Sequence, residues 1–189
     1  MRIIDNKKLL KGKKFEILIK KNIPSESGLG GGSVNAASIL RYFIKTNLIK
    51  LPKKKIYKIC NLVGSDVILG MYSSNLILRS NNTIKSILLK KNTHALIVKP
   101  VFGCSTKKIF SKVKKFTKAQ FNSPSKKMFN FNFLRKMNND LELIAINEYP
   151  KLNSLKNFLE KLYKVEFVRM TGSGSAIIAY FSSAKKCKE

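Results

Sequence analysis

Histidine, cysteine and acidic residues are scarce in this sequence of 189 residues, and each shortage excludes a class of function. The single histidine, His94, begins an apolar segment, and no Ser-His-Asp or Cys-His catalytic set forms around it. Cys60, Cys104 and Cys187 are far apart and lack the neighbouring His or Cys that a zinc site needs. We interpret His94 as structural and expect reduced thiols in a cytoplasmic protein.

Long hydrophobic runs are also lacking. No segment reaches the ~18 apolar residues of a membrane span, and the opening MRIIDNKKLL has no apolar stretch typical of a signal peptide. Hydrophobic residues nevertheless make up 44% of the chain, enough to bury a core. We therefore expect a soluble globular protein that has no membrane partner.

Positive charge dominates, with 38 Lys and Arg against 10 Asp and Glu, a formal net charge of +28. Such a field attracts nucleic acid and other polyanions. The excess is nearly all lysine spread along the chain, without an Arg-rich stripe or a basic segment interleaved with regularly spaced aromatics. We interpret it as exposed charge with no specific nucleic-acid partner; a non-catalytic basic nucleic-acid-binding module is the alternative from another class.

Apolar periodicity predicts the elements of the N-terminal half. Residues 14–23 alternate as in a strand with one buried face, and a glycine-rich loop follows. A helix capped by Ser33 or Asn35 comes next, and a second helix begins at Pro52 and stops at Gly64.

The remaining elements alternate between strands and helices. We predict strands over 76–79, 84–89 and 94–100, helices over 106–116, 140–148 and 151–163, a turn at Asn81–Asn82, a loop over 119–128 and a closing hairpin over 166–181. The final hairpin favours an α+β fold over a purely parallel sheet. A boundary near Lys91–Asn92 divides the chain into lobes 1–91 and 92–189.

The run G-L-G-G-G-S, Gly28 to Ser33, stands between the predicted strand and helix. Successive glycines let main-chain N–H groups point into one concavity, and the helix dipole adds positive potential, so an anion such as phosphate is favoured there. A Walker loop and a dinucleotide fingerprint are both excluded by the residues that follow. The structural alternative is a flexible strand-to-helix connection.

Two further motifs are ambiguous when taken alone. Asp66, in Gly64–Val67, is either an N-cap for the next element or a carboxylate that accepts a proton during phosphoryl transfer. The turn Thr171–Gly174 alternates glycine with hydroxyl residues, as in either a plain hairpin or a segment that closely approaches a ligand.

In this order, the three motifs resemble those of the GHMP superfamily of small-molecule kinases, and most of all the 4-diphosphocytidyl-2-C-methyl-D-erythritol kinase family. Pro24 to Ala37 is similar to that family's phosphate loop, and Gly64–Val67 to its catalytic Asp segment, with Ile68 in place of the family's Pro. The segments 95–110 and Asn139–Glu142 also resemble family motifs. A homoserine or mevalonate type of GHMP kinase is the nearer alternative.

The resemblance implies a two-lobed GHMP-kinase fold, with a partial ribosomal-S5-domain-2-like N-terminal lobe and a ferredoxin-like C-terminal lobe. It implies ATP and Mg²⁺ as cofactors, 4-diphosphocytidyl-2-C-methyl-D-erythritol as the small-molecule substrate, and a monomer or homodimer. Asp66 is the implied catalytic base, Ser33 a contact to Mg²⁺, and Thr171, Gly172, Ser173 and Gly174 the implied contacts to substrate or phosphate. The implied ATP-binding residues are Pro24, Ser25, Glu26, Ser27, Gly28, Leu29, Gly30, Gly31, Gly32, Ser33 and Val34.

Family members begin with a Pro-Ala-Lys-Ile-Asn-like strand whose Lys pairs with the catalytic Asp, and nothing before Phe15 resembles it. The helix and strand that close the C-terminal lobe are also not found before Glu189. We therefore expect an interior piece of such a kinase, or a chain with a miscalled start, of uncertain activity.

Overall fold

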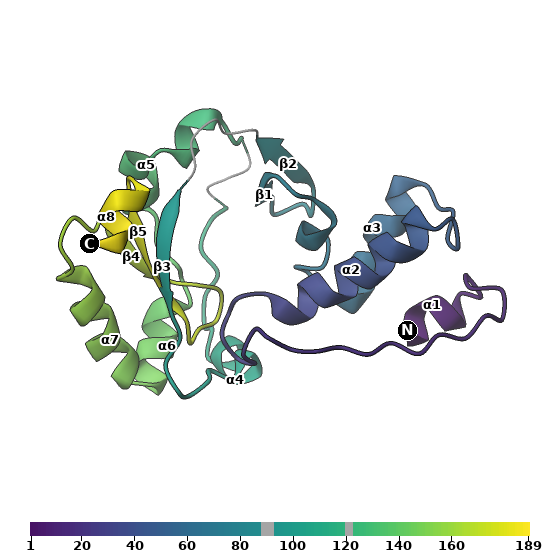
Figure 1. Cartoon of the computed structure of the whole chain (residues 1–189), viewed down its shortest axis with the longest axis horizontal. Coiled ribbons are helices and arrows are strands. Elements are labelled where there is room, and N and C mark those ends of the chain that lie inside the picture. The colour runs from purple at the N-terminus through teal and green to yellow at the C-terminus, as the bar shows by residue number, and fades with distance from the viewer. Residues whose placement is uncertain (88–92, 120–122) are drawn as a thin grey trace. The chain divides into compact units, whose positions relative to one another are not determined.

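The computed structural model describes residues 1–87, 93–119 and 123–189 (Figure 1). The chain divides into two compact units. The first comprises Met1–Asn22 and Gly30–Leu76, and the second comprises Ile23–Leu29 and Ile77–Glu189. The boundary expected near Lys91–Asn92 lies outside the described residues and stays a prediction.

Helices dominate the first unit. They are α1 (Arg2–Asn6), α2 (Gly31–Lys45), α3 (Lys53–Val63) and the short 3-10 helix η1 (Leu69–Met71). Leu40 and Phe43 of α2 and Ile59 and Cys60 of α3 are buried, as their helical spacing requires. The helices predicted after the glycine-rich loop and after Pro52 are therefore confirmed.

The strand predicted over 14–23 is wrong, because this segment has no regular structure. A strand needs a hydrogen-bonded neighbour, and both sheets among the described residues are built from other segments. Leu18 is 97% exposed, whereas Phe15 packs its ring 5.0 Å from that of Phe43. Apolar and polar residues thus alternate in this segment, but no neighbouring strand pairs with it.

A two-stranded sheet pairs β1 (Asn75–Leu78) with β2 (Ile84–Ile87). The turn predicted at Asn81–Asn82 is confirmed, since Asn82 has a φ of 59° and its N–H donates to Arg79 O at 3.0 Å. The end of the predicted strand, residues 88 and 89, lies outside the described residues.

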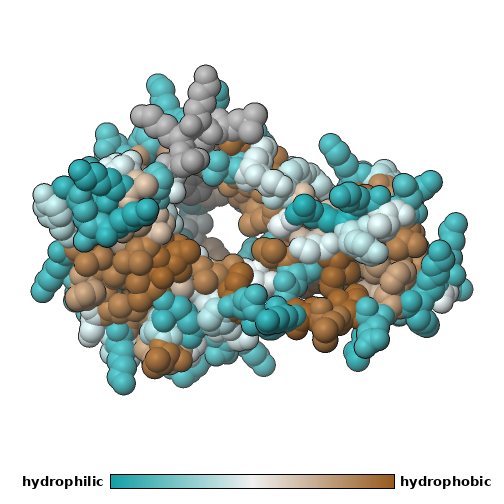
Figure 2. Space-filling model, viewed as in Figure 1, coloured by the Kyte–Doolittle hydropathy of each residue, from teal (hydrophilic) through white to brown (hydrophobic). Residues whose placement is uncertain are grey.

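The second unit has an antiparallel sheet of order β3-β5-β4, formed by β3 (His94–Val98), β4 (Phe167–Met170) and β5 (Ile177–Phe181). His94 pairs with Phe181, and Phe167 with Tyr180, so β4 and β5 form the predicted closing hairpin. Figure 2 shows hydrophobic atoms over this sheet, where Leu96 and Ile97 of edge strand β3 are 39% and 52% exposed. Together with the helices, these sheets confirm the α+β class.

Short helices accompany this sheet, and their buried side chains, such as Ile109, Leu152 and Leu159, share a core with β5. They are α4 (Thr106–Ser111), η2 (Lys126–Phe129), α5 (Phe131–Lys136), α6 (Glu142–Glu148), α7 (Lys151–Glu160) and α8 (Ala184–Lys188). No helix in the described ranges is long and apolar enough to cross a membrane.

Three helices are shorter than predicted, and the loop expected over 119–128 contains the start of η2. Helix α6 begins at Glu142 rather than at residue 140. Residues 120–122 of that loop lie outside the described ranges. Helix α4 ends at Ser111 rather than near residue 116, because the chain beyond it is polar and Phe116 is 87% exposed, so no buried face continues the helix. Helix α7 ends at Glu160, before the predicted end at Tyr163.

Three glutamates of the second unit are each shared between two cations. Glu148 contacts Lys108 and Lys112, Glu166 contacts Arg135 and Lys186, and Glu189 contacts Lys164 and Lys185. A few carboxylates thus hold several cations of different segments close together.

Candidate active site

The N-terminus of α2 has no side-chain cap. Gly30 is the N-cap with a φ of 69°, a left-handed conformation that glycine adopts without strain, and the helix starts at Gly31. The expected cap at Ser33 or Asn35 is therefore wrong, because Gly30 turns the chain into the helix earlier. Val34 N–H donates to Gly30 O at 2.9 Å, and the N–H groups before it have no acceptor within the helix. They and the dipole of a 15-residue helix suit an anion.

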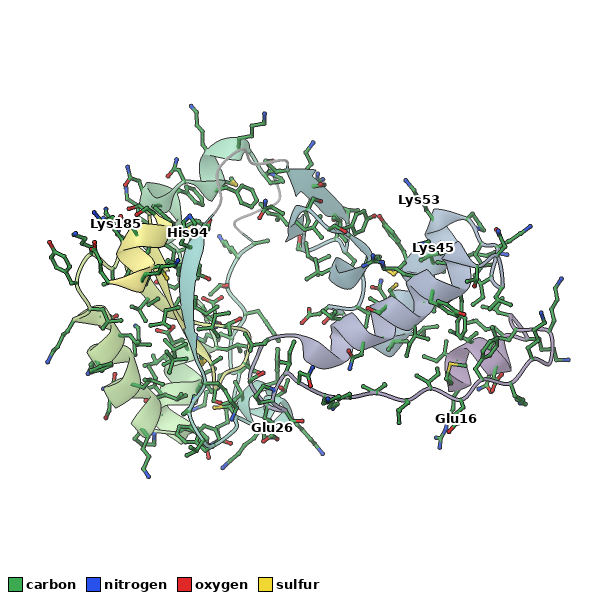
Figure 3. The ribbon with its side chains drawn as sticks, viewed as in Figure 1. Glu16, Glu26, Lys45, Lys53, His94 and Lys185 are labelled. Atoms are coloured by element: carbon green, nitrogen blue, oxygen red, sulfur yellow. The ribbon has the colours of Figure 1, made fainter. Side chains whose placement is uncertain are left out.

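Main-chain carbonyls of the segment before the helix bind the C-terminal glycine turn. Glu26 O accepts from Ser175 N–H at 3.0 Å and from Cys104 N–H at 3.1 Å, and Ser27 O accepts from Ala176 N–H at 3.0 Å. Glu26 lies beside α4 in Figure 3, where a Cβ on Gly103 would meet the Glu26 Cβ at 2.6 Å. Two motifs far apart in the sequence therefore meet inside the second unit.

Gly28 is the point of closest approach between the two motifs. It has a φ of 70°, and a Cβ there would lie 2.1 Å from Thr171 O. The Thr171 hydroxyl donates to Gly28 O at 3.1 Å. No other residue type fits this position without displacing the turn.

The turn at Thr171–Gly174 is itself held internally. Gly174 N–H donates to Thr171 O at 2.9 Å, and the hydroxyls of Ser173 and Thr106 share a hydrogen bond of 2.8 Å. Ser173 and Gly174 are buried, whereas Gly172 is exposed. Of the four residues predicted to contact substrate or phosphate, Ser173 and Gly174 therefore do not face solvent in this unit.

Sequence reasoning gave no role to Asn139 and Glu142, which support this turn. Asn139 Nδ2 donates to Met170 O at 2.9 Å and to Gly172 O at 2.8 Å, and a Glu142 oxygen accepts from Met170 N–H at 2.7 Å. Their partners are main-chain atoms, so no pairing of side-chain types could have revealed these contacts.

Asp66 belongs to the turn between α3 and η1 in the first unit. Its side chain is exposed and accepts a hydrogen bond from Ser65 Oγ at 3.3 Å. The N-cap alternative is wrong, because η1 follows Ile68 without a side-chain cap. Gly70 of η1 packs so closely on α2 that an added Cβ would meet that of Ala37 at 2.7 Å, which fixes this turn to the first half of α2.

Cys104 is the cysteine nearest the loop, and it is fully buried. The pKa of its thiol is raised to about 11, mainly by burial and also by the Glu26 carboxylate, whose effect is larger than the opposing effect of Lys99. A neutral thiol is a weak nucleophile, so Cys104 packs the loop rather than reacting.

Comparison with known proteins points to one family. Residues 2–75 match the model of the GHMP kinases N terminal domain. A "4-diphosphocytidyl-2-C-methyl-D-erythritol kinase" of Pelagibacter ubique (strain HTCC1062) is 53% identical over all of this chain, which covers 67% of that relative. One of Clostridium tetani (strain Massachusetts / E88) is 34% identical, with 91% of this chain and 65% of the relative covered. The chain thus spans about two thirds of the length of these curated relatives.

A solved structure supports the fold. The crystal structure of a 4-(cytidine 5'-diphospho)-2C-methyl-D-erythritol kinase superposes with a TM-score of 0.68 at 22% identity, covering 89% of this chain and 62% of that one. This likeness confirms the GHMP-kinase fold. On the sequence match along its full length, the chain belongs to the 4-diphosphocytidyl-2-C-methyl-D-erythritol kinase family of the GHMP kinases.

Proposed function

We propose that this chain contributes the phosphate-binding loop and catalytic base of a kinase. The reaction transfers the γ-phosphoryl group of ATP to the 2-hydroxyl of 4-diphosphocytidyl-2-C-methyl-D-erythritol, a step of non-mevalonate isoprenoid precursor synthesis. The observation that carries the proposal is the uncapped N-terminus of α2 behind Gly30, in a chain 53% identical to a relative with that name.

The loop from Pro24 to Val34 binds ATP in this proposal. The N–H groups of Gly31, Gly32 and Ser33 meet the phosphate oxygens, since they lack intrahelical acceptors. The Glu26–Gly28 segment, tied to the C-terminal turn, fixes the start of the loop. A loop held in place before ATP arrives loses less conformational entropy on binding.

Asp66 accepts the proton of the acceptor hydroxyl. As the hydroxyl oxygen forms its bond to the γ-phosphorus, the bond from phosphorus to the β,γ-bridging oxygen breaks and ADP leaves. The exposed carboxylate is open to an acceptor, and Ser65 holds one of its oxygens.

The residues also fit Mg²⁺ bound chiefly through ATP. The described part of the chain holds no group of three His, Cys, Asp or Glu that could form a protein cage for a metal. Magnesium commonly keeps several waters and binds substrate phosphates with few protein ligands, and we assign its protein contact to the Ser33 hydroxyl. When bound, Mg²⁺ neutralises phosphate charge.

The turn Thr171–Gly174 has two roles in the proposal. Thr171 already binds Gly28 and so holds the loop, whereas Ser173 binds Thr106 of α4. The exposed main chain at Gly172 is the part that contacts phosphate or substrate.

The test is acceptor-dependent transfer of label from [γ-³²P]ATP with Mg²⁺. Label in 4-diphosphocytidyl-2-C-methyl-D-erythritol, and none in homoserine or mevalonate offered at equal concentration, supports the proposal. Label in either of those alcohols instead would assign the chain to another GHMP activity. Absence of transfer to any of them would contradict the function proposed for this chain.

A further inference from the structure

Asn139, just before α6, and Glu142, its first residue, support the C-terminal glycine turn. Nδ2 of the Asn139 amide donates to Met170 O at 2.9 Å and to Gly172 O at 2.8 Å. Its oxygen accepts from Leu141 N–H at 3.0 Å, which sets the orientation of the amide. Both N–H bonds of Asn139 therefore have main-chain acceptors.

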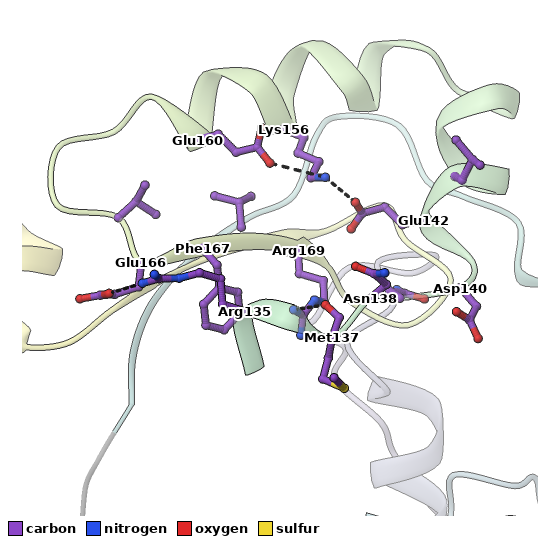
Figure 4. A pocket seen from close by; sticks show the side chains of 14 residues that line it. Arg135, Met137, Asn138, Asp140, Glu142, Lys156, Glu160, Glu166, Phe167 and Arg169 are labelled. Atoms are coloured by element: carbon purple, nitrogen blue, oxygen red, sulfur yellow. Dashed lines mark hydrogen bonds and ion pairs between the residues drawn. The ribbon is translucent and has the colours of Figure 1, made fainter. Parts of the chain in front are cut away.

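Glu142, the first residue of α6, adds a second contact. One of its oxygens accepts from Met170 N–H, and the other pairs with Lys156 of α7 at 2.7 Å. Figure 4 shows Lys156 between Glu142 and Glu160, so the carboxylate is fixed at both ends. Helices α6 and α7 thereby fix the main chain where the turn begins.

The turn also contacts the loop, through Thr171. Thr171 donates to Gly28 O, and a Cβ on Gly28 would be 2.1 Å from Thr171 O, so the main chains of the two segments are in close contact. Only Leu29 and Gly30 separate Gly28 from the first residue of α2. A shift of the turn is therefore passed to the start of the loop.

We infer that Asn139 is a positioning residue for the phosphate-binding loop, acting through the Met170–Gly172 main chain, with Glu142 as its partner. The inference rests on the proposed function, in which this loop binds ATP. Two converging carbonyl oxygens require a donor with two N–H bonds, which asparagine supplies and an ionised carboxylate of the same size does not.

The test compares Asn139→Asp with Asn138→Asp. Both introduce one negative charge at nearly constant volume, and both residues line the same cavity of about 670 Å³, but Asn138 is exposed. Amide hydrogen exchange is followed at Ser175 and Ala176, which donate to Glu26 O and Ser27 O. Affinity for MgATP is measured by calorimetry. We expect about tenfold faster exchange and about tenfold weaker MgATP binding in Asn139→Asp, with Asn138→Asp close to the parent protein.

A pH series separates positioning through this hydrogen bond from a general loss of packing. Protonation near the ordinary carboxyl pKa of about 4 returns one O–H donor, so part of the exchange protection in Asn139→Asp should come back at low pH. Asn139→Leu, which has no titratable group, should show no such recovery relative to the parent. Equal exchange in the two aspartate variants, or equal pH responses of Asn139→Asp and Asn139→Leu, would overturn the inference.

If circular dichroism shows that Asn139→Asp does not fold, Thr171→Val tests the contact between the turn and the loop, because it removes the hydroxyl that donates to Gly28 O. Faster exchange at Ala176 supports the inference, and parent-like exchange overturns it. Failure of the parent protein to bind MgATP counts against the proposed function, whereas the exchange data still decide whether Asn139 positions the loop.

Discussion

The hydroxyl of Thr171 donates a hydrogen bond to the main-chain oxygen of Gly28, which lies 143 residues earlier in the chain. Two glycine-rich segments are thus parts of one folded structure within the second unit. The stability of this unit and the shape of the loop therefore depend on the same few atoms.

Replacing Gly28 by alanine should lower the free energy of unfolding by about 3 kcal/mol, because a Cβ would lie 2.1 Å from Thr171 O in a residue with positive φ. Gly30→Ala is the matched control, since Gly30 also has a positive φ but nothing within 4 Å of an added Cβ. Left-handed strain alone should cost about 1 kcal/mol there. Chemical denaturation compares the two, and equal losses would show that the contact with Thr171 does not matter.

Gly31→Val should abolish measurable ATP binding. Gly31 is the first residue of α2, and a branched side chain there obstructs approach to the N–H groups of the first turn. Ser38→Val adds the same side chain at an exposed position of α2 and should leave affinity unchanged. Calorimetric titration with MgATP gives the answer, and parent-like affinity in Gly31→Val would refute the phosphate-loop assignment.

Asp66→Asn should reduce turnover by about 10²-fold or more while ATP affinity stays within about twofold, because the amide cannot accept the hydroxyl proton. Steady-state ADP release with the acceptor measures turnover, and equilibrium titration measures affinity. Asp5→Asn removes an exposed carboxylate elsewhere in the first unit and serves as the control for charge. Turnover within a few fold of the parent would show that Asp66 is not the base.

Acid should selectively weaken the contacts of Glu148. Hydrogen bonds from Lys108 and Lys112 lower the pKa of this carboxyl below its ordinary value of 4.5. A depressed pKa in the folded state gives stability that is present above 4.5 and is lost as the pH falls through the folded-state value. The difference in unfolding free energy between the parent and Glu148→Gln should therefore be larger at about pH 7 than at about pH 3. If the difference in unfolding free energy between the two proteins did not change with pH, the lowered pKa of Glu148 would be contradicted.

Local signals predicted much of the fold. Apolar residues at helical spacing, with Pro52 before and Gly64 after, gave α3, and strand–glycine–strand patterning gave the β4–β5 hairpin. Residues 14–23 alternate equally well but form no strand, because alternation is a property of one segment whereas a strand also needs a neighbour.

The roles assigned to the site residues stay predictions, and the structure describes only how the loop and the turn are arranged. Glycine composition pointed to the loop and the turn, since close main-chain approach excludes side chains, as Gly28 shows. The sequence could not show that these two segments bind each other, because their contacts join main-chain atoms such as Glu26 O and Ser175 N. Asn139 escaped notice as a site residue for the same reason.

Glu148, Glu166 and Glu189 each contact two cations, so replacing the glutamate should affect stability differently from replacing one of its cations. Losing Lys108 leaves Glu148 with Lys112, whereas losing Glu148 leaves two neighbouring ammonium groups facing each other. With 10 acidic residues against 38 basic ones, few other carboxylates can take over that position. Within these three clusters, replacing the shared glutamate should therefore be more harmful than replacing any one of its cations.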